Sequence, residues 1–231
     1  MKTVILVILS IFLILPVARS QNNLLPVAKS QDSNKFKLTF GYTIGGGQNS
    51  NGYRLTHDEQ GIVYSEGSIL FSTGINTSVF VTEKLRPRLE FTYSEMKYGM
   101  ALSSLNSDLY KSTTKTINLN VNLNLDYLVL DKNKFQLFLS PGIVTEYVVG
   151  RTQKNYFTDG TTNFKKYNVF TQQYPSAIAG ANFSILAKYK LNKHFGVTLT
   201  PGYNYYFRKY VTVNDKTYTR ALLNFGLEYT F

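Results

Sequence analysis

The 231-residue chain contains no cysteine. This absence excludes disulfide bonds, cysteine-ligated metal sites and the lipidated cysteine of a lipoprotein. Long hydrophobic runs are missing too, because the apolar stretch at residues 4–15 covers only about 12 residues, whereas a membrane-spanning helix needs about 20. We therefore do not expect a helical membrane anchor.

Acidic side chains are scarce, with 14 Asp and Glu against 25 Lys and Arg and a formal net charge of +11. In an exported protein, such a charge suits anionic lipid headgroups or lipopolysaccharide phosphates better than nucleic acid. The alternative is that the charge serves solubility alone. We predict lipid or lipopolysaccharide partners and no nucleic-acid partner.

The first residues indicate export. Lys2 gives a positive start, the apolar stretch follows, and Ala18-Arg19-Ser20 supplies the small residues that a signal peptidase recognises. We predict a signal peptide over residues 1–20, an N-terminal periplasmic segment over 21–33 and one folded domain over 34–231. The heptapeptide at 15–21 recurs almost unchanged at 25–31, so cleavage after Ser30 is the alternative to cleavage after Ser20.

Strict alternation of apolar and polar residues dominates the folded domain. It is clearest in residues 117–127, where Ile, Leu, Val and Tyr alternate with four Asn and one Asp. A helix would distribute these two sets around its circumference, so the pattern predicts a strand. The same rhythm recurs in residues 35–44, 68–81, 85–94, 135–147, 176–189, 195–207 and 219–231.

The connections between these segments alternate in length. Short turns are predicted near residues 82–84, 131–134 and 191–194, and longer loops near 45–66, 98–114, 150–175 and 208–217. Short turns on one side and long loops on the other are typical of outer-membrane barrels. We predict an all-β fold, an eight-stranded antiparallel up-and-down transmembrane β-barrel. Pro87, Pro141 and Pro201 lie within predicted strands and remove ladder donors, so bulges or local register breaks are expected there.

Two features indicate which face of the barrel is outside. Seven glycines, including Gly41, Gly142 and Gly226, fall on the polar register, where small residues suit a crowded concave side. Aromatic residues of the apolar register gather toward the two ends of the strands, as in the interfacial girdles of a membrane barrel. The alternative is a lipocalin-like barrel with an apolar lining. We predict that the apolar register faces lipid.

The last eight residues contain Asn224, Gly226, Tyr229 and Phe231 in the order polar, any, Gly, any, any, aromatic, any, aromatic. This order resembles the C-terminal β-signal that barrel-insertion machinery recognises. With the strand at residues 86–94, the chain resembles small eight-stranded outer-membrane barrels of the OmpA-like or OmpX-like kind, and PorT-type outer-membrane barrels. The resemblance implies the outer membrane of a Gram-negative bacterium. It implies either a non-enzymatic structural or surface-binding role, or a PorT-like accessory role in secretion or envelope assembly.

The polar register would fill the barrel interior, since eight strands leave room only for side chains. Buried charges must be paired, so we expect Glu228 to face Lys35 or Lys37, and Arg86 and Arg88 to meet Asp126. A satisfied polar core is the favoured interpretation, and an ion gate is the alternative. The predicted interior network is Lys35, Lys37, Arg86, Arg88, Glu90, Asn118, Asn120, Asn122, Asn124, Asp126, Glu146, Arg220 and Glu228.

An enzymatic role has little support in the sequence. Only two histidines exist, His57 in a predicted loop beside Asp58 and His194 in a predicted periplasmic turn. A lipid-A-modifying enzyme with its histidine at His57 is the catalytic alternative. No metal-ligand spacing or nucleotide fingerprint is present, so we predict no catalytic residue, metal or other cofactor.

The predicted loop at 150–175 is the best candidate for binding, because binding residues concentrate on loops held by a rigid scaffold. It interleaves basic and aromatic residues that could hold lipopolysaccharide phosphates and sugars, or a surface or secretion protein. The alternative is a loop that only orders the barrel rim. The candidate binding residues are Arg151, Lys154, Tyr156, Lys165, Lys166 and Tyr167.

Overall fold

The computed structural model describes residues 37–49, 54–55, 62–103, 108–167, 177–207 and 219–231. The predicted signal peptide, the segment 21–33, Lys35 and His57 lie outside these residues. Within the described part of the chain, no helix is long and apolar enough to cross a membrane.

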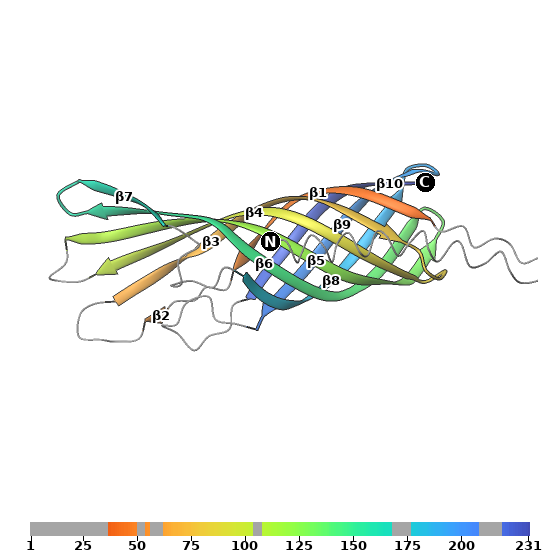
Figure 1. Ribbon diagram of the computed structural model, residues 1–231, viewed down its shortest axis with the longest axis horizontal. Coiled ribbons are helices and arrows are strands. Elements are labelled where there is room, and N and C mark those ends of the chain that lie inside the picture. Colours follow the sequence, from red (N-terminus) through yellow and green to blue (C-terminus); the bar gives the residue numbers. More distant parts are fainter. Residues whose placement is uncertain (1–36, 50–53, 56–61, 104–107, 168–176, 208–218) are drawn as a thin grey trace, which may run out of the picture. The chain divides into compact units, whose positions relative to one another are not determined.

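Antiparallel strands make up almost all of the described chain (Figure 1). The order around the sheet is β1-β10-β9-β8-β6-β5-β4-β3, and β1 also pairs with β3, which closes a ring of eight strands. The predicted eight-stranded antiparallel barrel is therefore confirmed. The strands are β1 (Leu38–Asn49), β2 (Arg54–Leu55), β3 (Ile62–Val79), β4 (Leu85–Ser103), β5 (Leu109–Lys132), β6 (Phe135–Phe157), β7 (Thr162–Tyr167), β8 (Ala177–Lys190), β9 (Phe195–Tyr206) and β10 (Thr219–Thr230).

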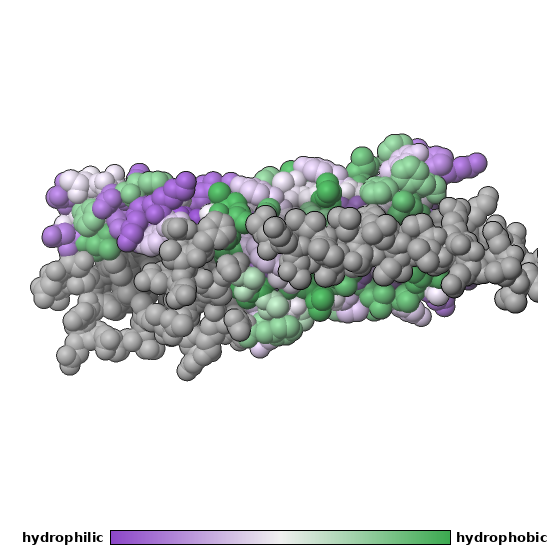
Figure 2. All heavy atoms as spheres, in the orientation of Figure 1, coloured by the Kyte–Doolittle hydropathy of each residue, from purple (hydrophilic) through white to green (hydrophobic). Residues whose placement is uncertain are grey.

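The alternating sequence sorts side chains between the lumen and the outside. On β5, Asn118 is fully buried and Asn124 is 3% exposed, whereas Leu119 and Leu123 are 46% and 50% exposed. A closed barrel that turns its apolar residues outward is stable only where lipid replaces water. Figure 2 shows this apolar surface over the barrel strands. The predicted membrane orientation is confirmed, and the lipocalin-like alternative is wrong.

The two ends of the barrel differ. The turn end carries the short connections at residues 80–84, 133–134 and 191–194 and the last residue, Phe231 (Figure 1). The opposite end, the hairpin end, carries the longer connections. Exposed aromatic residues mark the turn end at Tyr127, Phe135, Tyr189, Phe195 and Phe231, and the hairpin end at Tyr203 and Tyr205. Such girdles lie where hydrocarbon meets lipid headgroups.

Four strands are much longer than a membrane requires. β3, β4, β5 and β6 have 18, 19, 24 and 23 residues, whereas a tilted strand crosses the bilayer in about 10. Their excess length continues past the hairpin end, where neighbouring strands stay paired and β6 also pairs with β7 (Figure 1). We call β7 and the parts of β4–β6 beyond the barrel wall the protruding sheet. The prediction of loops at 98–114 and 150–175 is largely wrong, because most of these residues are strand.

The prolines do not produce the predicted bulges. Each continues a ladder on one side, where Pro87, Pro141 and Pro201 lie opposite Leu125, Phe183 and Leu223. On the strand at its other side, each proline has no paired residue. At Pro141 and Pro201 the pairing resumes beyond the proline in the same register. The missing donor therefore costs local pairs and leaves the register intact. The irregularities present lie at Glu66/Ile69, Leu109/Lys111, Ile117/Asn118 and Leu128/Leu130.

Candidate functional site

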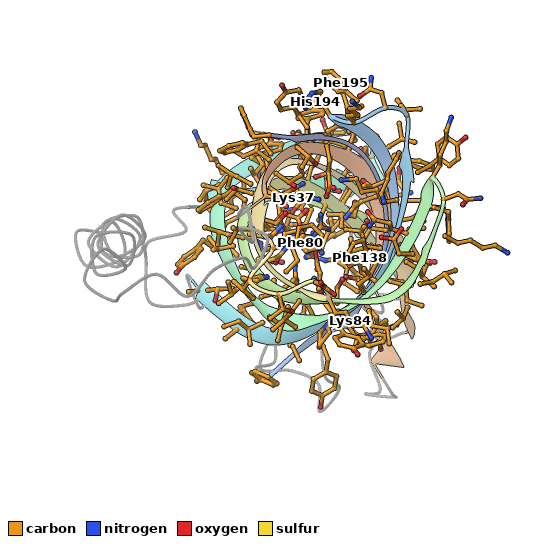
Figure 3. All side chains as sticks on the ribbon, turned by 90° about the vertical axis from the view of Figure 1, so that its right-hand side faces the viewer. Lys37, Phe80, Lys84, Phe138, His194 and Phe195 are labelled. Carbon is orange, nitrogen blue, oxygen red and sulfur yellow. The ribbon has the colours of Figure 1, made fainter. Side chains whose placement is uncertain are left out.

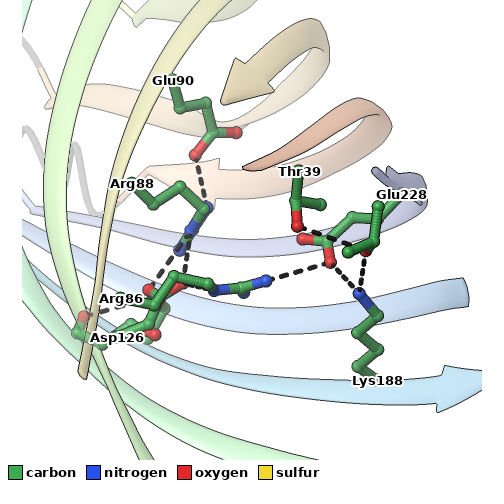
Figure 4. Close-up of polar contacts among 10 residues, drawn as sticks. Thr39, Arg86, Arg88, Glu90, Asp126, Lys188 and Glu228 are labelled. Carbon is green, nitrogen blue, oxygen red and sulfur yellow. Dashed lines mark hydrogen bonds and ion pairs between the residues drawn. The ribbon is translucent and has the colours of Figure 1, made fainter. Parts of the chain in front are cut away.

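A cluster of ion pairs lies in the lumen near the turn end (Figure 4). Arg86 Nη2 lies 2.8 Å from Asp126 Oδ2, and both side chains are fully buried. Arg88 Nε lies 3.1 Å from the same carboxylate oxygen, and Arg88 Nη1 lies 3.0 Å from Glu90 Oε2. β4 and β5 place Arg86 directly opposite Asp126, which is why the alternating sequence identified this contact.

Glu228 on β10 completes this cluster. Its Oε2 accepts from Arg86 Nη1 at 3.1 Å and lies 2.8 Å from Lys188 Nζ. The predicted pairing of Glu228 with the start of the first strand is not found, because Lys37 is exposed and Lys35 lies outside the described residues. The sequence could not show that Arg86 and Lys188 reach Glu228 across the lumen.

Aromatic rings cover the cluster on the side of the turn end. The guanidinium carbon of Arg86 lies 4.5 Å from the centre of the Phe138 ring and 5.6 Å from that of Phe80. Phe138 is fully buried and Leu186 is 2% exposed. Figure 3 shows Phe80 and Phe138 inside the ring of strands. Arg86 is therefore held both by carboxylates and by aromatic faces.

A second cluster lies farther along β6 and β10. Arg220 Nη2 lies 2.8 Å from Glu146 Oε2, which also accepts a hydrogen bond of 2.9 Å from the Tyr206 hydroxyl. Arg220 Nε donates to Asn49 Oδ1 at 2.8 Å. Within each cluster, the charges of the described buried residues balance. Four buried cations, Arg86, Arg88, Lys188 and Arg220, face four buried carboxylates, Glu90, Asp126, Glu146 and Glu228.

An apolar layer in the lumen adjoins the second cluster and was missed by sequence reasoning. It consists of Leu70, Met96, Val144, Val148, Ile178 and Tyr206. These residues lie on the register that is polar elsewhere. The signal was present in consecutive apolar pairs such as Ile143-Val144 and Val148-Val149, which supply both faces of one strand. The interior is therefore partly apolar rather than wholly polar.

The four asparagines of β5 line the lumen, from Asn124 beside the first cluster to Asn120, opposite Glu146, and Asn118 beyond it. Asn120 Nδ2 donates to Ser94 Oγ at 3.1 Å, but the Oδ1 atoms of Asn118, Asn120, Asn122 and Asn124 have no hydrogen-bond partner among the described residues. Buried polar atoms of this kind are normally satisfied by internal water.

Glycines on neighbouring strands make room for some of the asparagines in the lumen. A Cβ added at Gly142 would lie 2.2 Å from Asn124 Oδ1, and one at Gly45 would lie 2.1 Å from Asn224 Oδ1. The side chains of Asn124 and Asn224 therefore each lie over a glycine of the adjacent strand. These contacts explain why Gly142 and Gly45 lack a side chain.

The candidate binding residues of the predicted loop lie on the two faces of the protruding sheet. A bulge between Val148 and Gly150, opposite Asn118 and Ile117, reverses the inside–outside alternation of β6. Beyond it, Arg151, opposite the fully buried Thr116, lies on the face that continues the lumen. We call this the inner face, and the face that continues the lipid-facing register the outer face. Arg151, Lys165 and Tyr167 lie on the inner face, and Lys154, Tyr156 and Lys166 on the outer face.

The inner face is internally bonded. Gln153 Nε2 donates to Ser112 Oγ at 2.8 Å and to Asn155 Oδ1 at 2.9 Å, and the Tyr167 hydroxyl donates to Gln153 Oε1. Arg151 and Lys165 lie over the ring of Tyr167 at 5.3 and 5.0 Å. These contacts fix the inner-face residues to one another.

The outer face is basic and aromatic. Lys154 lies over the ring of Tyr156 at 4.9 Å, and Tyr156 contacts Tyr110 at 6.4 Å between ring centres. Across the sheet, Lys115 pairs with Glu95 at 2.8 Å. Lys154 and Lys166 are exposed and have no carboxylate partner among the described residues. Figure 2 shows the hydrophilic surface of this part of the molecule.

The residues that resemble an insertion signal lie on β10 and at its end. Tyr229 contacts Phe231, Phe195 and His194 at ring distances of 4.8, 5.0 and 5.6 Å. Asn224 lies on β10 opposite Gly45, and Gly226 lies opposite Thr43. Their role in insertion stays a prediction. Among the described residues, no group of three or more His, Asp or Glu could hold a metal ion.

No family model matches the chain, and no curated protein matches it. The solved structures similar to it include Neisserial surface protein A, at 13% identity over 85% of this chain and 97% of that one, with a TM-score of 0.43. Ail of Yersinia pestis in complex with the heparin analogue sucrose octasulfate has 9% identity over 85% and 99%, with a TM-score of 0.42. The outer-membrane protease OmpT of Escherichia coli has 10% identity over 88% and 99%, also with a TM-score of 0.42. The closed ring, apolar exterior and aromatic girdles are those of a bacterial outer-membrane β-barrel.

Proposed function

We propose that the protein is a non-enzymatic surface barrel whose protruding sheet binds lipopolysaccharide through its outer face. One observation carries the proposal: Lys154 and Lys166 lie on the face that continues the lipid-facing side of the barrel. Just beyond the hydrocarbon, that face meets the sugar and phosphate layer of the outer leaflet. Lysines with adjacent tyrosine rings are suited to phosphates and sugars in that layer.

The two faces of the sheet supply a matched experiment. The double variant Lys154→Gln/Lys166→Gln removes two charges from the outer face. The control Arg151→Gln/Lys165→Gln removes two charges from the same strands on the inner face. Folding of each variant is checked by the migration shift between boiled and unboiled samples on a gel.

Binding of fluorescent lipopolysaccharide to the purified barrel in detergent would then be titrated. Since a lysine near an anionic surface contributes about 1 kcal/mol, we expect the outer-face variant to bind about tenfold or more weakly. The inner-face control should stay within about twofold, and added salt should weaken binding by the parent protein. Equal losses in both variants, or no loss in either, would overturn the proposal.

A further inference from the structure

The turn end carries a second basic surface, on the opposite side of the membrane from the protruding sheet. Neighbouring turns bring its lysines together: the backbone N of Lys190 donates to the carbonyl of Lys134 at 2.7 Å, and Phe135 lies opposite Tyr189. Lys132 ends β5 and Lys134 lies in the β5–β6 turn, while Lys190 ends β8 and Lys193 lies in the β8–β9 turn. We call these four residues the turn-end lysines.

Among the described residues, only one carboxylate, that of Asp131, pairs with a turn-end lysine. Asp131 lies 3.2 Å from Lys190 Nζ and also accepts a hydrogen bond of 2.8 Å from Gln136 Nε2. Lys132, Lys134 and Lys193 are exposed, and no described carboxylate pairs with them. Three positive charges at these turns therefore remain available to an external anion.

The turn-end lysines lie at the boundary of the apolar belt. Lys134 precedes Phe135, Lys190 follows Tyr189, and Lys193 lies two residues before Phe195. The three aromatic residues are 39%, 46% and 40% exposed and face lipid. Because aromatic girdles lie at headgroup level, amino groups one or two residues beyond them reach the phosphates of the leaflet.

Both turns are ordered before any ligand binds. Asn192 Oδ1 accepts hydrogen bonds from the backbone N of His194 at 2.9 Å and of Phe195 at 2.8 Å. The His194 ring stacks on Tyr229 at 5.6 Å, and its Nδ1 lies 3.0 Å from the carbonyl of Thr230. Asn133 adopts a φ of 53°, which makes the tight β5–β6 turn. The lysines are thus presented from fixed backbone positions, which lowers the cost of binding.

We propose that Lys132, Lys134 and Lys193, above Tyr189 and Phe195, form a binding site for the headgroup of an anionic phospholipid in the periplasmic leaflet of the outer membrane. Two observations favour a phospholipid at this site: its headgroup is opposite in charge to the lysines, and the site adjoins the lipid-facing aromatic residues. A soluble anion would gain nothing from the adjoining aromatic surface, whereas a phospholipid places its phosphate by the lysines and its acyl chains against the rings.

The test is native mass spectrometry of the full barrel in detergent, titrated with phosphatidylglycerol and, separately, with phosphatidylcholine of the same acyl chains. The triple variant Lys132→Gln/Lys134→Gln/Lys193→Gln is compared with the parent. Lys84→Gln is the control, because Lys84 lies beside Glu83 and on the opposite side of the ring from His194 and Phe195 (Figure 3). Heat modifiability on a gel verifies that each variant is folded.

We expect the parent to bind phosphatidylglycerol more tightly than phosphatidylcholine. The triple variant should lose at least about tenfold in affinity for phosphatidylglycerol, since each lysine near an anionic headgroup contributes a factor of about five. Its affinity for phosphatidylcholine should not change, and Lys84→Gln should behave as the parent. Equal binding of the two lipids by the parent would overturn the site. So would an unchanged triple variant, or an equal loss in Lys84→Gln.

Discussion

Strands β5 and β6 pass through two environments, the barrel wall and the protruding sheet. In the wall, β5 buries Asn122 to 9% exposure and turns Leu123 outward at 50%. In the protruding sheet, the same strand carries polar residues on both faces, with Ser112 inside and Thr113 outside, and both residues stay paired with β4 and β6. Alternation of apolar and polar residues is therefore imposed by the lipid and is not needed for strand pairing.

Ion pairs should show the largest difference between the two regions. Asp126→Ala leaves Arg86 and Arg88 in the lumen without their shared carboxylate, and we expect a cost of about 3–5 kcal/mol. Glu95→Ala breaks the Lys115–Glu95 pair, whose side chains are 37% and 30% exposed, and should cost at most about 1 kcal/mol. The measurement is urea unfolding of the barrel in lipid vesicles, followed by the heat-modifiable gel band. Similar costs for the two variants would contradict the comparison.

A charge placed on the outer surface should separate the regions next. Leu123→Arg puts a guanidinium against the hydrocarbon, which costs about 2–4 kcal/mol near the membrane midplane. Thr113→Arg puts the same group on the outer face of the protruding sheet, where we expect a change within about 0.5 kcal/mol. The same unfolding assay in vesicles measures both. A costly Thr113→Arg would show that the protruding sheet also contacts hydrocarbon.

Glycine replacements on β6 test how tightly each region is packed. A Cβ at Gly142 in the wall would lie 2.2 Å from Asn124 Oδ1 and 2.5 Å from the carbonyl of Leu123, so Gly142→Ala should cost about 1–3 kcal/mol. At Gly150, the nearest atom is Ile117 Cδ1 at 3.4 Å, which is ordinary contact, and Gly150→Ala should be almost neutral. The measurement is the urea midpoint of unfolding of each variant relative to the parent. Equal midpoints for the two variants would refute the difference in packing.

The smallest effect concerns the turns and their response to pH. The hydrogen bond from the Thr161 hydroxyl lowers the pKa of Asp159 in the β6–β7 turn, with a second bond from the Thr161 backbone N. The pKa of Asp159 is lower in the folded protein than in the unfolded chain. The hydrogen bonds therefore stabilise the turn fully when the pH is above the unfolded pKa, and this stabilisation is lost as the pH falls through the folded pKa. Amide NMR of Thr161 against pH should show the loss, and Thr161→Ala should raise the Asp159 pKa.

The β8–β9 turn is the control for that measurement. There Asn192 makes similar hydrogen bonds to the backbone N of His194 and Phe195, but a neutral amide does not titrate. The amide of Phe195 should therefore not follow the acid transition seen at Thr161. A matching transition at both turns would mean that the effect is general acid unfolding.

Much of the fold could be predicted from the sequence because successive residues of every strand in the wall face lipid and lumen in turn, and the two environments favour apolar and polar side chains. The eight strands, the outward apolar face and the contact of Arg86 and Arg88 with Asp126 follow from this period of two. Contacts across the lumen do not follow from it, because they depend on the tilt of the strands and the length of each side chain. Glu228 therefore pairs with Arg86 and Lys188 and not with the predicted Lys37.

The candidate binding residues were harder to place for a different reason. Outside the membrane, alternation carries no signal, so the strand at 150–157 resembled a loop. The bulge opposite Asn118 and Ile117 then exchanges the two faces of β6. A one-residue change of register moves every later side chain to the other face, and alternation alone does not locate that change. Lys154 and Lys165 are both exposed, but their separation onto opposite faces of the sheet was not predicted.

The place of Glu228 on the last strand has a consequence for assembly. Arg86 on β4 and Lys188 on β8 share this carboxylate, and β10 supplies it only when it pairs with β1 and β9. A partly assembled sheet would hold both cations in the lumen without it, which disfavours any membrane-inserted form that lacks β10. We expect insertion and ring closure to be one cooperative event, which is completed only when β10 pairs with both of its neighbours.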